Sequence, residues 1–470
     1  MWQMMQGCMR EWRRAVGGLR WRPVLVVMAA GLLGGCSLDS LLKSDQLPPD
    51  VTDPAYTESL AGAMTAYRGV LLQFRRGYDG AVAMAGLLGD EMAPSSPTFL
   101  GQLISDADRR EIREGVSIDI YGKLQKARGD AAQAIGLLRD YAPESHRPLI
   151  AHVYALEGYA ELHLAELFCS GIPLSTLDYK GDQTLRAGSS TADVYRHAIA
   201  LFDTALVLAG DSTHFLDLAR VGKARALLGL GERAQAAAVV AEVPDGFQYL
   251  VQFGDTANST NFARVYSGVA WDYTVSDREG FNGLDYRTSG DPRTATTLRP
   301  GYTARPVYHP DKYSDNGASP IVLASGVEAR LIEAEAALAA EDPSWLTALN
   351  ALRTDGTYST QPNAVDSTRT DTLWNAGTGA VAGLEPLEDP GTADARIDLL
   401  FRERAFWLFL TGQRQGDLRR LIRQYGRDSE QVYPTGPWLT GRYARDVTFP
   451  IPEDERLYNP LFTGCIDRGA

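Results

Sequence analysis

Apolar residues recur at helical spacing through most of this chain. A clear early example lies between about 53 and 77, where five apolar side chains fall on one helix face: Leu60, Met64, Tyr67, Leu71 and Phe74. The same spacing predicts further helices over 107–142, 147–169, 191–209, 213–230, 231–242, 325–341, 343–354 and 393–425. Strand patterns are scarce. We therefore expect a mostly α fold with few short strands.

Two stretches have the pattern of paired helices, residues 218–244 and 327–353. Small residues, chiefly alanine, would let the two helices of each pair approach closely, and Gly-Leu-Gly and Asp-Pro supply the turns. The segments 155–168 and 193–209 fit the same arrangement with a longer connection. These pairs resemble tetratricopeptide hairpins, which bury a continuous core when several of them stack. We expect an α-solenoid scaffold.

The helical pattern is interrupted at about 246–324 and again at 355–392, where Gly, Pro, Asn, Asp, Ser and Thr are frequent. A structureless loop of that length is uncommon in a compact domain, so we expect short strands and ordered loops packed on the helices. Binding residues are often carried by such loops. These two insertions are where we expect a ligand site.

The first 35 residues have the pattern of a secretory leader. Five arginines precede an apolar run of twelve residues, which is shorter than the roughly twenty that a membrane-spanning helix needs. The run ends in Leu-Gly-Gly-Cys, which resembles a bacterial lipobox. We therefore predict a lipoprotein signal peptide over 1–35, lipidation of Cys36, a tether over 36–52 and one helical domain over 53–470. The alternative is an ordinary cleavable signal that has a cysteine nearby by accident.

The charge of the chain argues against a nucleic-acid partner. The whole chain has a net charge of −13, and removal of the leader, with its five arginines and Glu11, leaves 41 basic and 58 acidic residues, a net charge of about −17. Such a chain repels a phosphate backbone. A hydrophobic content of 44% is nevertheless that of a globular protein.

Two cysteines remain once Cys8 has left with the leader and Cys36 carries lipid: Cys169 and Cys465. In an exported protein a pair of thiols suggests a disulfide. The alternative is two free, buried cysteines. If the bond forms, it pins the C-terminal tail to the end of a helix near the middle of the chain.

Catalytic motifs are missing from the sequence, which contains no HExxH, GxSxG, Walker or GxGxxG signature. His163 and Glu166 have a spacing that can serve a metal, but their leucine neighbours favour a helix-packing role. We therefore expect neither an enzyme nor a bound cofactor or metal. Glu403, Arg404, Arg414 and Asp417, in the predicted helix 393–425, are expected to form a packed ion network, with Gly412 breaking or bending the helix.

Aromatic residues are frequent in the first insertion. Flat rings suit the C–H faces of sugars, while polar neighbours can bond the hydroxyl groups. The candidate ligand-binding residues are Phe99, Trp271, Tyr273, Tyr286, Arg287, Tyr302 and Tyr308. The alternative for each ring is that it packs the loops onto the helical core.

Taken in order, five sequence blocks resemble the SusD/RagB nutrient-binding outer-membrane lipoproteins. They are LLGDEM at 87–92, EGYAELHLAELFCSGIPL at 157–174, VEARLIEAEAAL followed by LNALR, LLFRERAFWLFLTGQRQGDLRRL at 399–421 and TFPIPEDERLYNP at 448–460. The blocks extend over nearly the whole chain after the leader, and their order and spacing are more specific than any one of them.

The resemblance implies a SusD-like helical scaffold anchored by lipid in the outer membrane and facing the cell exterior. It also implies a partner, a SusC-like TonB-dependent transporter, on which the protein acts as a lid. The implied function is capture of a nutrient without bond cleavage, and the nutrient that we expect is an oligosaccharide. A tetratricopeptide-like envelope lipoprotein that scaffolds a protein complex is the alternative.

Overall fold

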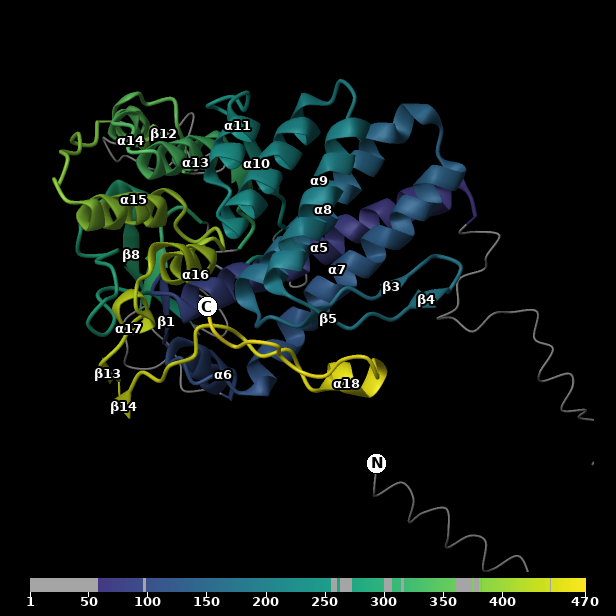
Figure 1. Ribbon diagram of the computed structural model, residues 1–470, viewed down its shortest axis with the longest axis horizontal. Helices are drawn as coiled ribbons and strands as arrows, with labels where there is room; N and C mark the ends of the chain where they lie inside the picture. Colours follow the sequence, from purple (N-terminus) through teal and green to yellow (C-terminus); the bar gives the residue numbers. More distant parts are fainter. Residues whose placement is uncertain are drawn as a thin grey trace, which may run out of the picture. The chain divides into compact units, whose positions relative to one another are not determined.

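Most helices of this protein begin and end close to where the apolar periodicity places them, but α5 continues to Leu88 and α6 was not predicted (Figure 1). The computed structural model describes residues 58–95, 99–254, 260–262, 273–299, 307–313, 317–360, 374–375, 380–381, 383–439 and 441–470. Its longer helices are α5 (Leu60–Leu88), α6 (Phe99–Asp108), α7 (Glu114–Tyr141), α8 (Arg147–Leu167), α9 (Thr191–Leu208), α10 (Thr213–Leu230), α11 (Arg233–Val240), α13 (Gly326–Ala339), α14 (Ser344–Thr354), α15 (Ala393–Trp407) and α16 (Arg414–Tyr425). Shorter ones are α17 (Ser429–Val432), α18 (Asp454–Tyr458) and the 3-10 turns η1 (Glu144–His146) and η2 (Pro292–Thr294).

Residues Glu58–Ala470 form one compact unit. The predicted leader, Cys36 and the tether lie outside the described residues. Of the helices in the described ranges, none combines the length and hydrophobicity that crossing a bilayer requires.

Consecutive helices pack as the predicted hairpins. The helices α8 and α9 lie against each other, α10 pairs with α11, and α13 pairs with α14. The close approach depends on small residues at the contacts. A methyl group on Gly222 of α10, for example, would lie 2.4 Å from the ring of Phe202 on α9. The prediction of a mostly α, tetratricopeptide-like scaffold is confirmed.

Within the described ranges, strands occur only as two-stranded antiparallel pairs. The pairs are β1 (Met92–Pro94) with β7 (Tyr273–Val275), β2 (Ile172–Pro173) with β5 (Gly188–Ser189), β3 (Thr176–Leu177) with β4 (Gln183–Thr184), β6 (Gln248–Val251) with β10 (Ile321–Ser325), β8 (Thr296–Arg299) with β9 (Val307–Pro310), β11 (Trp374–Asn375) with β12 (Ala380–Val381), and β13 (Pro437–Trp438) with β14 (Gly441–Arg442). Several of these strands lie in the described parts of the first predicted insertion, where short strands were expected.

The predicted helix 393–425 is divided into α15 and α16, and Gly412 lies in the break. Gly412 has a φ of +81°, in the left-handed region that favours glycine. Leu410, two residues earlier, also has a positive φ of 53°. The turn lets two buried helices follow each other at an angle, so the prediction of a broken helix is confirmed.

The predicted ion network is only partly correct. Asp417 does bind Arg404, with Nε and Nη2 of the arginine 2.8 and 2.9 Å from the two carboxylate oxygens. Glu403, however, binds Arg293, and Arg414 binds Asp90. The helix break turns these neighbouring side chains toward different parts of the core, so each is neutralised by a residue far away in sequence.

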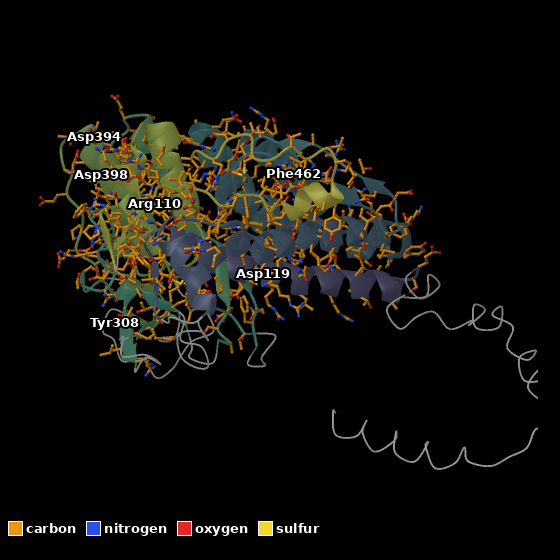
Figure 2. The ribbon with its side chains drawn as sticks, turned by 90° about the horizontal axis from the view of Figure 1, so that it is seen from below. Arg110, Asp119, Tyr308, Asp394, Asp398 and Phe462 are labelled. Carbon is orange, nitrogen blue, oxygen red and sulfur yellow. A yellow bond between two sulfur atoms is a disulfide. The ribbon has the colours of Figure 1, made fainter. Side chains whose placement is uncertain are left out.

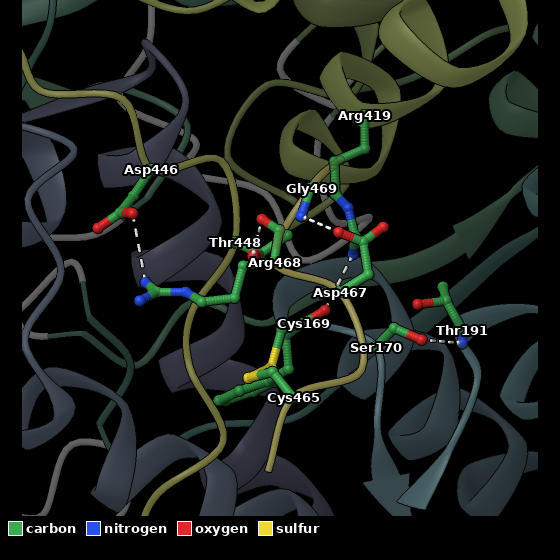
Figure 3. Close-up of a disulfide and its surroundings, with 11 residues drawn as sticks. Cys169, Ser170, Thr191, Arg419, Asp446, Thr448, Cys465, Asp467, Arg468 and Gly469 are labelled. Carbon is green, nitrogen blue, oxygen red and sulfur yellow. Dashed lines mark hydrogen bonds and ion pairs between the residues drawn. A yellow bond between two sulfur atoms is a disulfide. The ribbon is translucent and has the colours of Figure 1, made fainter.

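Cys169 and Cys465 form the predicted disulfide, which joins the residues just after α8 to the C-terminal tail (Figure 3). Backbone hydrogen bonds from Cys169 and Ser170 flank it. The N–H of Cys169 donates to the carbonyl of Phe449 at 2.8 Å, and the N–H of Ser170 donates to the carbonyl of Asp467 at 2.9 Å. The C-terminal segment, residues 446–470, is thereby held along the helical scaffold by hydrogen bonds and by a covalent bond.

Candidate functional site

Three short strands of the first insertion, β7, β8 and β9, lie together beside β1. The strand β7 pairs with β1, placing Tyr273 opposite Pro94, while β9 pairs with β8, placing Tyr308 opposite Leu298. The two pairs are joined because the N–H of Tyr308 donates to Oγ1 of Thr274 at 2.9 Å. The fold thus places candidates from two segments, around 273 and around 308, on neighbouring strands.

Arg287 and Tyr308 form the most clearly defined candidate contact. The guanidinium carbon of Arg287 lies 3.9 Å from the centroid of the Tyr308 ring, which is cation–π geometry. Both side chains are partly exposed, and Leu298 opposite Tyr308 is 58% exposed. Figure 2 shows Tyr308 at the edge of the unit. We call this pair the Arg287–Tyr308 platform.

The backbone beneath the platform is held by hydrogen bonds. The N–H of Arg287 donates to Oδ1 of Asp277 at 2.9 Å, and Tyr308 is fixed by the β8 ladder and by Thr274. The Nε atom of Arg287 is buried and has no hydrogen-bond partner in the described part of the chain. A flat ring beside a partly exposed guanidinium group suits a ligand that has both an apolar face and hydroxyl groups, as sugars do.

The prediction that Tyr286 contacts a ligand is corrected by its burial. Only 1% of Tyr286 is exposed, and its ring centroid lies 5.4 Å from that of Phe406 and 5.0 Å from that of Phe409. Its hydroxyl group donates to Oδ1 of Asp90 at 3.2 Å. Tyr286 therefore packs the insertion onto the break between α15 and α16, which is the alternative given above for each ring.

The structure describes the remaining candidate ligand-binding residues only in part. Tyr273 is partly exposed on β7, close to the platform strands. Phe99 begins α6, which packs beside β1, but its side chain is not described. Trp271 and Tyr302 lie outside the described residues. The structure thus brings Tyr273, Arg287 and Tyr308 to one region and removes Tyr286 from it.

Sequence reasoning missed the residue that fixes the insertion to the helices. Asp90 accepts two hydrogen bonds from Arg414, at 2.6 and 2.9 Å, and a third from the N–H of Leu284 at 2.9 Å. These bonds connect α16 to the segment that leads into Arg287. Asp90 lies in the block LLGDEM, and Arg414 lies in the block at 399–421. The occurrence of both blocks in one chain was the only sequence signal for this contact. The separation of 324 residues between Asp90 and Arg414 hid the contact.

Glu91, next to Asp90, is a buried carboxyl group with a shifted pKa. Burial raises its pKa to about 8, although the N–H of Leu410, which donates to Oε1 at 2.9 Å, and the charge of Arg414 oppose the shift. Glu91 therefore carries its proton in most folded molecules at neutral pH.

This shift predicts how stability depends on pH. Between pH 4.5 and 8, Glu91 is ionised in the unfolded chain but keeps its proton in the folded chain. The contribution of Glu91 to the free energy of unfolding is therefore complete below pH 4.5 and is lost as the pH rises through 8. The slope is about 1.4 kcal/mol per pH unit within that window. Urea denaturation at pH 5, 6, 7 and 8 should show that wild type loses more stability than Glu91→Gln. If the free energy of unfolding changed with pH by the same amount in both proteins, the raised pKa of Glu91 would be contradicted.

His163 has the packing role that its leucine neighbours predicted. It is completely buried on α8, its ring centroid is 5.2 Å from that of Tyr78, and burial holds its pKa well below its usual value. Glu166 forms a two-point ion pair with Arg225. Within the described ranges, no group of three or more His, Cys, Asp or Glu side chains is arranged to hold a metal ion.

The overall architecture matches solved structures over most of its length. A SusD-like carbohydrate binding protein from Bacteroides vulgatus aligns with a TM-score of 0.59 at 16% identity, covering 86% of this chain and 97% of the other. A SusD homolog from Bacteroides thetaiotaomicron aligns with a TM-score of 0.63 at 12% identity, covering 88% and 99%. This chain has the SusD fold. NanU of B. fragilis shares it, with a TM-score of 0.59 at 12% identity over 89% and 99% of the two chains.

The SusD fold confirms the resemblance seen in the five sequence blocks. No protein-family model and no curated protein sequence matches this chain. At 12–16% identity the sequence alone is therefore a weak guide, whereas the fold aligns over 86–88% of this chain. The Arg287–Tyr308 platform is carried by one of the irregular insertions of this fold.

Proposed function

We propose that this protein is an outer-membrane lipoprotein that binds a nutrient without cleaving it. The nutrient that we propose is an oligosaccharide. The observation that carries the proposal is the partly exposed Arg287–Tyr308 platform on a SusD fold. A similar structure from Bacteroides vulgatus is described as a carbohydrate binding protein and another as a putative sugar binding protein. A tyrosine ring covers the apolar face of a sugar, and an arginine bonds its hydroxyl groups.

The lipobox-like Leu-Gly-Gly-Cys sequence supports attachment to the membrane through Cys36. Each buried acyl methylene contributes about 0.8 kcal/mol, and two or more chains anchor a protein stably. We propose that the helical unit faces the cell exterior.

A SusC-like TonB-dependent transporter is the proposed partner, on which this protein acts as a lid that delivers the bound sugar. The alternative is an envelope scaffold that uses its tetratricopeptide-like helices to hold a protein complex. Affinity purification from the native membrane separates the two. Recovery of a large β-barrel transporter supports the lid, and recovery of an envelope-assembly complex in its place supports the scaffold.

The platform predicts which tyrosine matters for binding. Replacing Tyr308 with alanine is expected to weaken oligosaccharide binding about fivefold or more, since stacking on an aromatic ring contributes about 1 kcal/mol. Isothermal titration with malto-, cello- and xylo-oligosaccharides and with oligogalacturonate would first identify a ligand and then measure the change.

Tyr458→Ala is the matched control, because Tyr458 is 79% exposed on α18, an element remote in sequence from the platform strands. It is expected to bind like wild type. Equal losses in the two variants would place the ligand elsewhere, and the absence of binding to every sugar would argue against the proposed function.

A further inference from the structure

A cavity of about 280 Å³ lies between α5 and β6. Neither residue of the Arg287–Tyr308 platform lines it. One wall is a stripe of α5, in which Arg68, Leu71, Leu72 and Arg75 follow each other at helical spacing. The strand β6 supplies the opposite wall through Tyr249, Leu250 and Val251, and Gln252 follows. The cavity therefore combines apolar surface with two guanidinium groups.

The positive charge on this wall is only weakly compensated in the described part of the chain. Neither Arg68 nor Arg75 forms an ion pair there, and the guanidinium carbon of Arg75 lies 5.9 Å from the ring centroid of Phe253. Burial and the nearby Arg76 lower the pKa of Arg75, while Asp79 opposes them. Elsewhere on the surface, Arg220 is paired with Asp217 and Glu242. An acidic protein thus leaves a local concentration of positive charge at this cavity.

Asp79 is the acidic residue that follows these arginines on α5, but it is a weak counter-charge. Its carboxylate accepts the N–H of Phe262 at 2.7 Å. Burial raises the pKa of Asp79 to about 7, so the side chain is partly neutral at physiological pH.

The β6 wall is fixed by a buried hydrogen-bonded chain. The hydroxyl groups of Tyr249 and Tyr67 lie 2.5 and 2.8 Å from the two ring nitrogens of His152. Burial lowers the pKa of His152 to about 3, so the ring is neutral and offers one donor and one acceptor. The Tyr249 ring cannot turn freely and forms a preorganised side of the cavity.

We propose that this cavity binds a carboxylate-bearing sugar unit, such as a uronic acid, with Arg75 and Arg68 as its counter-charges. The inference rests on the proposed function and adds the class of ligand. The planar guanidinium group matches a carboxylate at two points, while Leu71, Leu72 and Tyr249 offer apolar surface to the ring.

The test compares trigalacturonate with its methyl ester, which keeps the same rings and removes the charge. Calorimetric titration of the purified protein should show that the acid binds at least about tenfold more tightly than the ester. Arg75→Ala should remove most of that preference. Arg76→Ala is the matched control, because Arg76 carries the same charge on the next residue of α5 but does not line the cavity.

Each outcome decides the proposal. Equal affinities for acid and ester, or equal losses in the Arg75 and Arg76 variants, would overturn it, and so would tighter binding of triglutamate than of trigalacturonate. If neutral sugars bind in a Tyr308-dependent way and the acid is not preferred, this inference fails while the proposed function stands. The comparison of acid with ester uses only the wild-type protein, so it does not depend on how well a variant folds.

Discussion

Replacing Asp417 with alanine is expected to lower the free energy of unfolding by about 3–5 kcal/mol. Asp417 is 4% exposed and accepts hydrogen bonds from Arg404 at 2.8 and 2.9 Å and from Arg420 at 2.7 Å. Glu335 is the second carboxylate of the cluster and pairs with Arg420. Without Asp417, two buried guanidinium groups share one remaining carboxylate, which is why the loss is large.

The charge state of Asp417 supports this expectation. Burial alone would raise its pKa, but the positive charges of Arg404 and Arg420 outweigh burial and hold the pKa at about 2. The stabilisation is therefore complete above pH 3.8 and is lost as pH falls through 2. Denaturation at pH 7 measures the full effect.

Asp398→Ala is the control for that experiment. Asp398 also binds an arginine, Arg427 at 3.0 Å, but its side chain is 68% exposed (Figure 2). Exposed ion pairs contribute less than about 1 kcal/mol. Guanidinium chloride denaturation of both variants compares a buried with an exposed carboxylate. An Asp417→Ala protein as stable as Asp398→Ala would mean that the core accommodates the unpaired arginines.

Replacing Cys465 with serine is expected to cost about 2–5 kcal/mol of stability. The disulfide closes a loop between residues 296 apart in sequence, and a bond that joins distant residues removes many conformations from the unfolded chain. Without the bond, the C-terminal segment keeps its backbone contacts, such as the N–H of Ile466 to the carbonyl of Ser170 at 2.7 Å. We expect it to open locally and to become the first site of proteolysis.

A reductant provides the control for the cysteine variant. When dithiothreitol is added, the midpoint temperature of thermal denaturation of the wild type should fall to that of Cys465→Ser. The midpoint of the variant should not change. Limited proteolysis followed by mass spectrometry should find early cuts within 446–470 in the variant. If reduction leaves the wild-type transition unchanged, the bond does not stabilise the fold.

The sequence was informative where structure depends on local periodicity. Helices such as α9 and α10 could be placed within one or two residues, because their apolar faces repeat along one segment. The helix α5, in contrast, continues to Leu88, beyond the predicted end near 77. Its last turns are nearly all buried, so their apolar residues show no helical stripe from which to recognise them.

Contacts between distant segments could not be predicted in the same way. Arg293 lies 110 residues before its partner Glu403, and no local pattern connects the two. Tyr286 was mistaken for a ligand residue because its neighbours Asp285 and Arg287 are polar, while its own ring faces the core. The platform itself depends on two strands that become neighbours only through the tertiary fold, so the sequence could name its residues but not pair them.

Because Cys465 follows Cys169 by 296 residues, their bond can form only after everything between them has been made. Synthesis runs from the amino terminus, so the thiol of Cys169 waits for its partner until residue 465 has been added. Any product that stops before residue 465, through an early stop codon or a proteolytic cut, lacks the cysteine with which Cys169 would pair. The bond thereby distinguishes molecules that contain residue 465 from shortened ones, in which Cys169 keeps a free thiol.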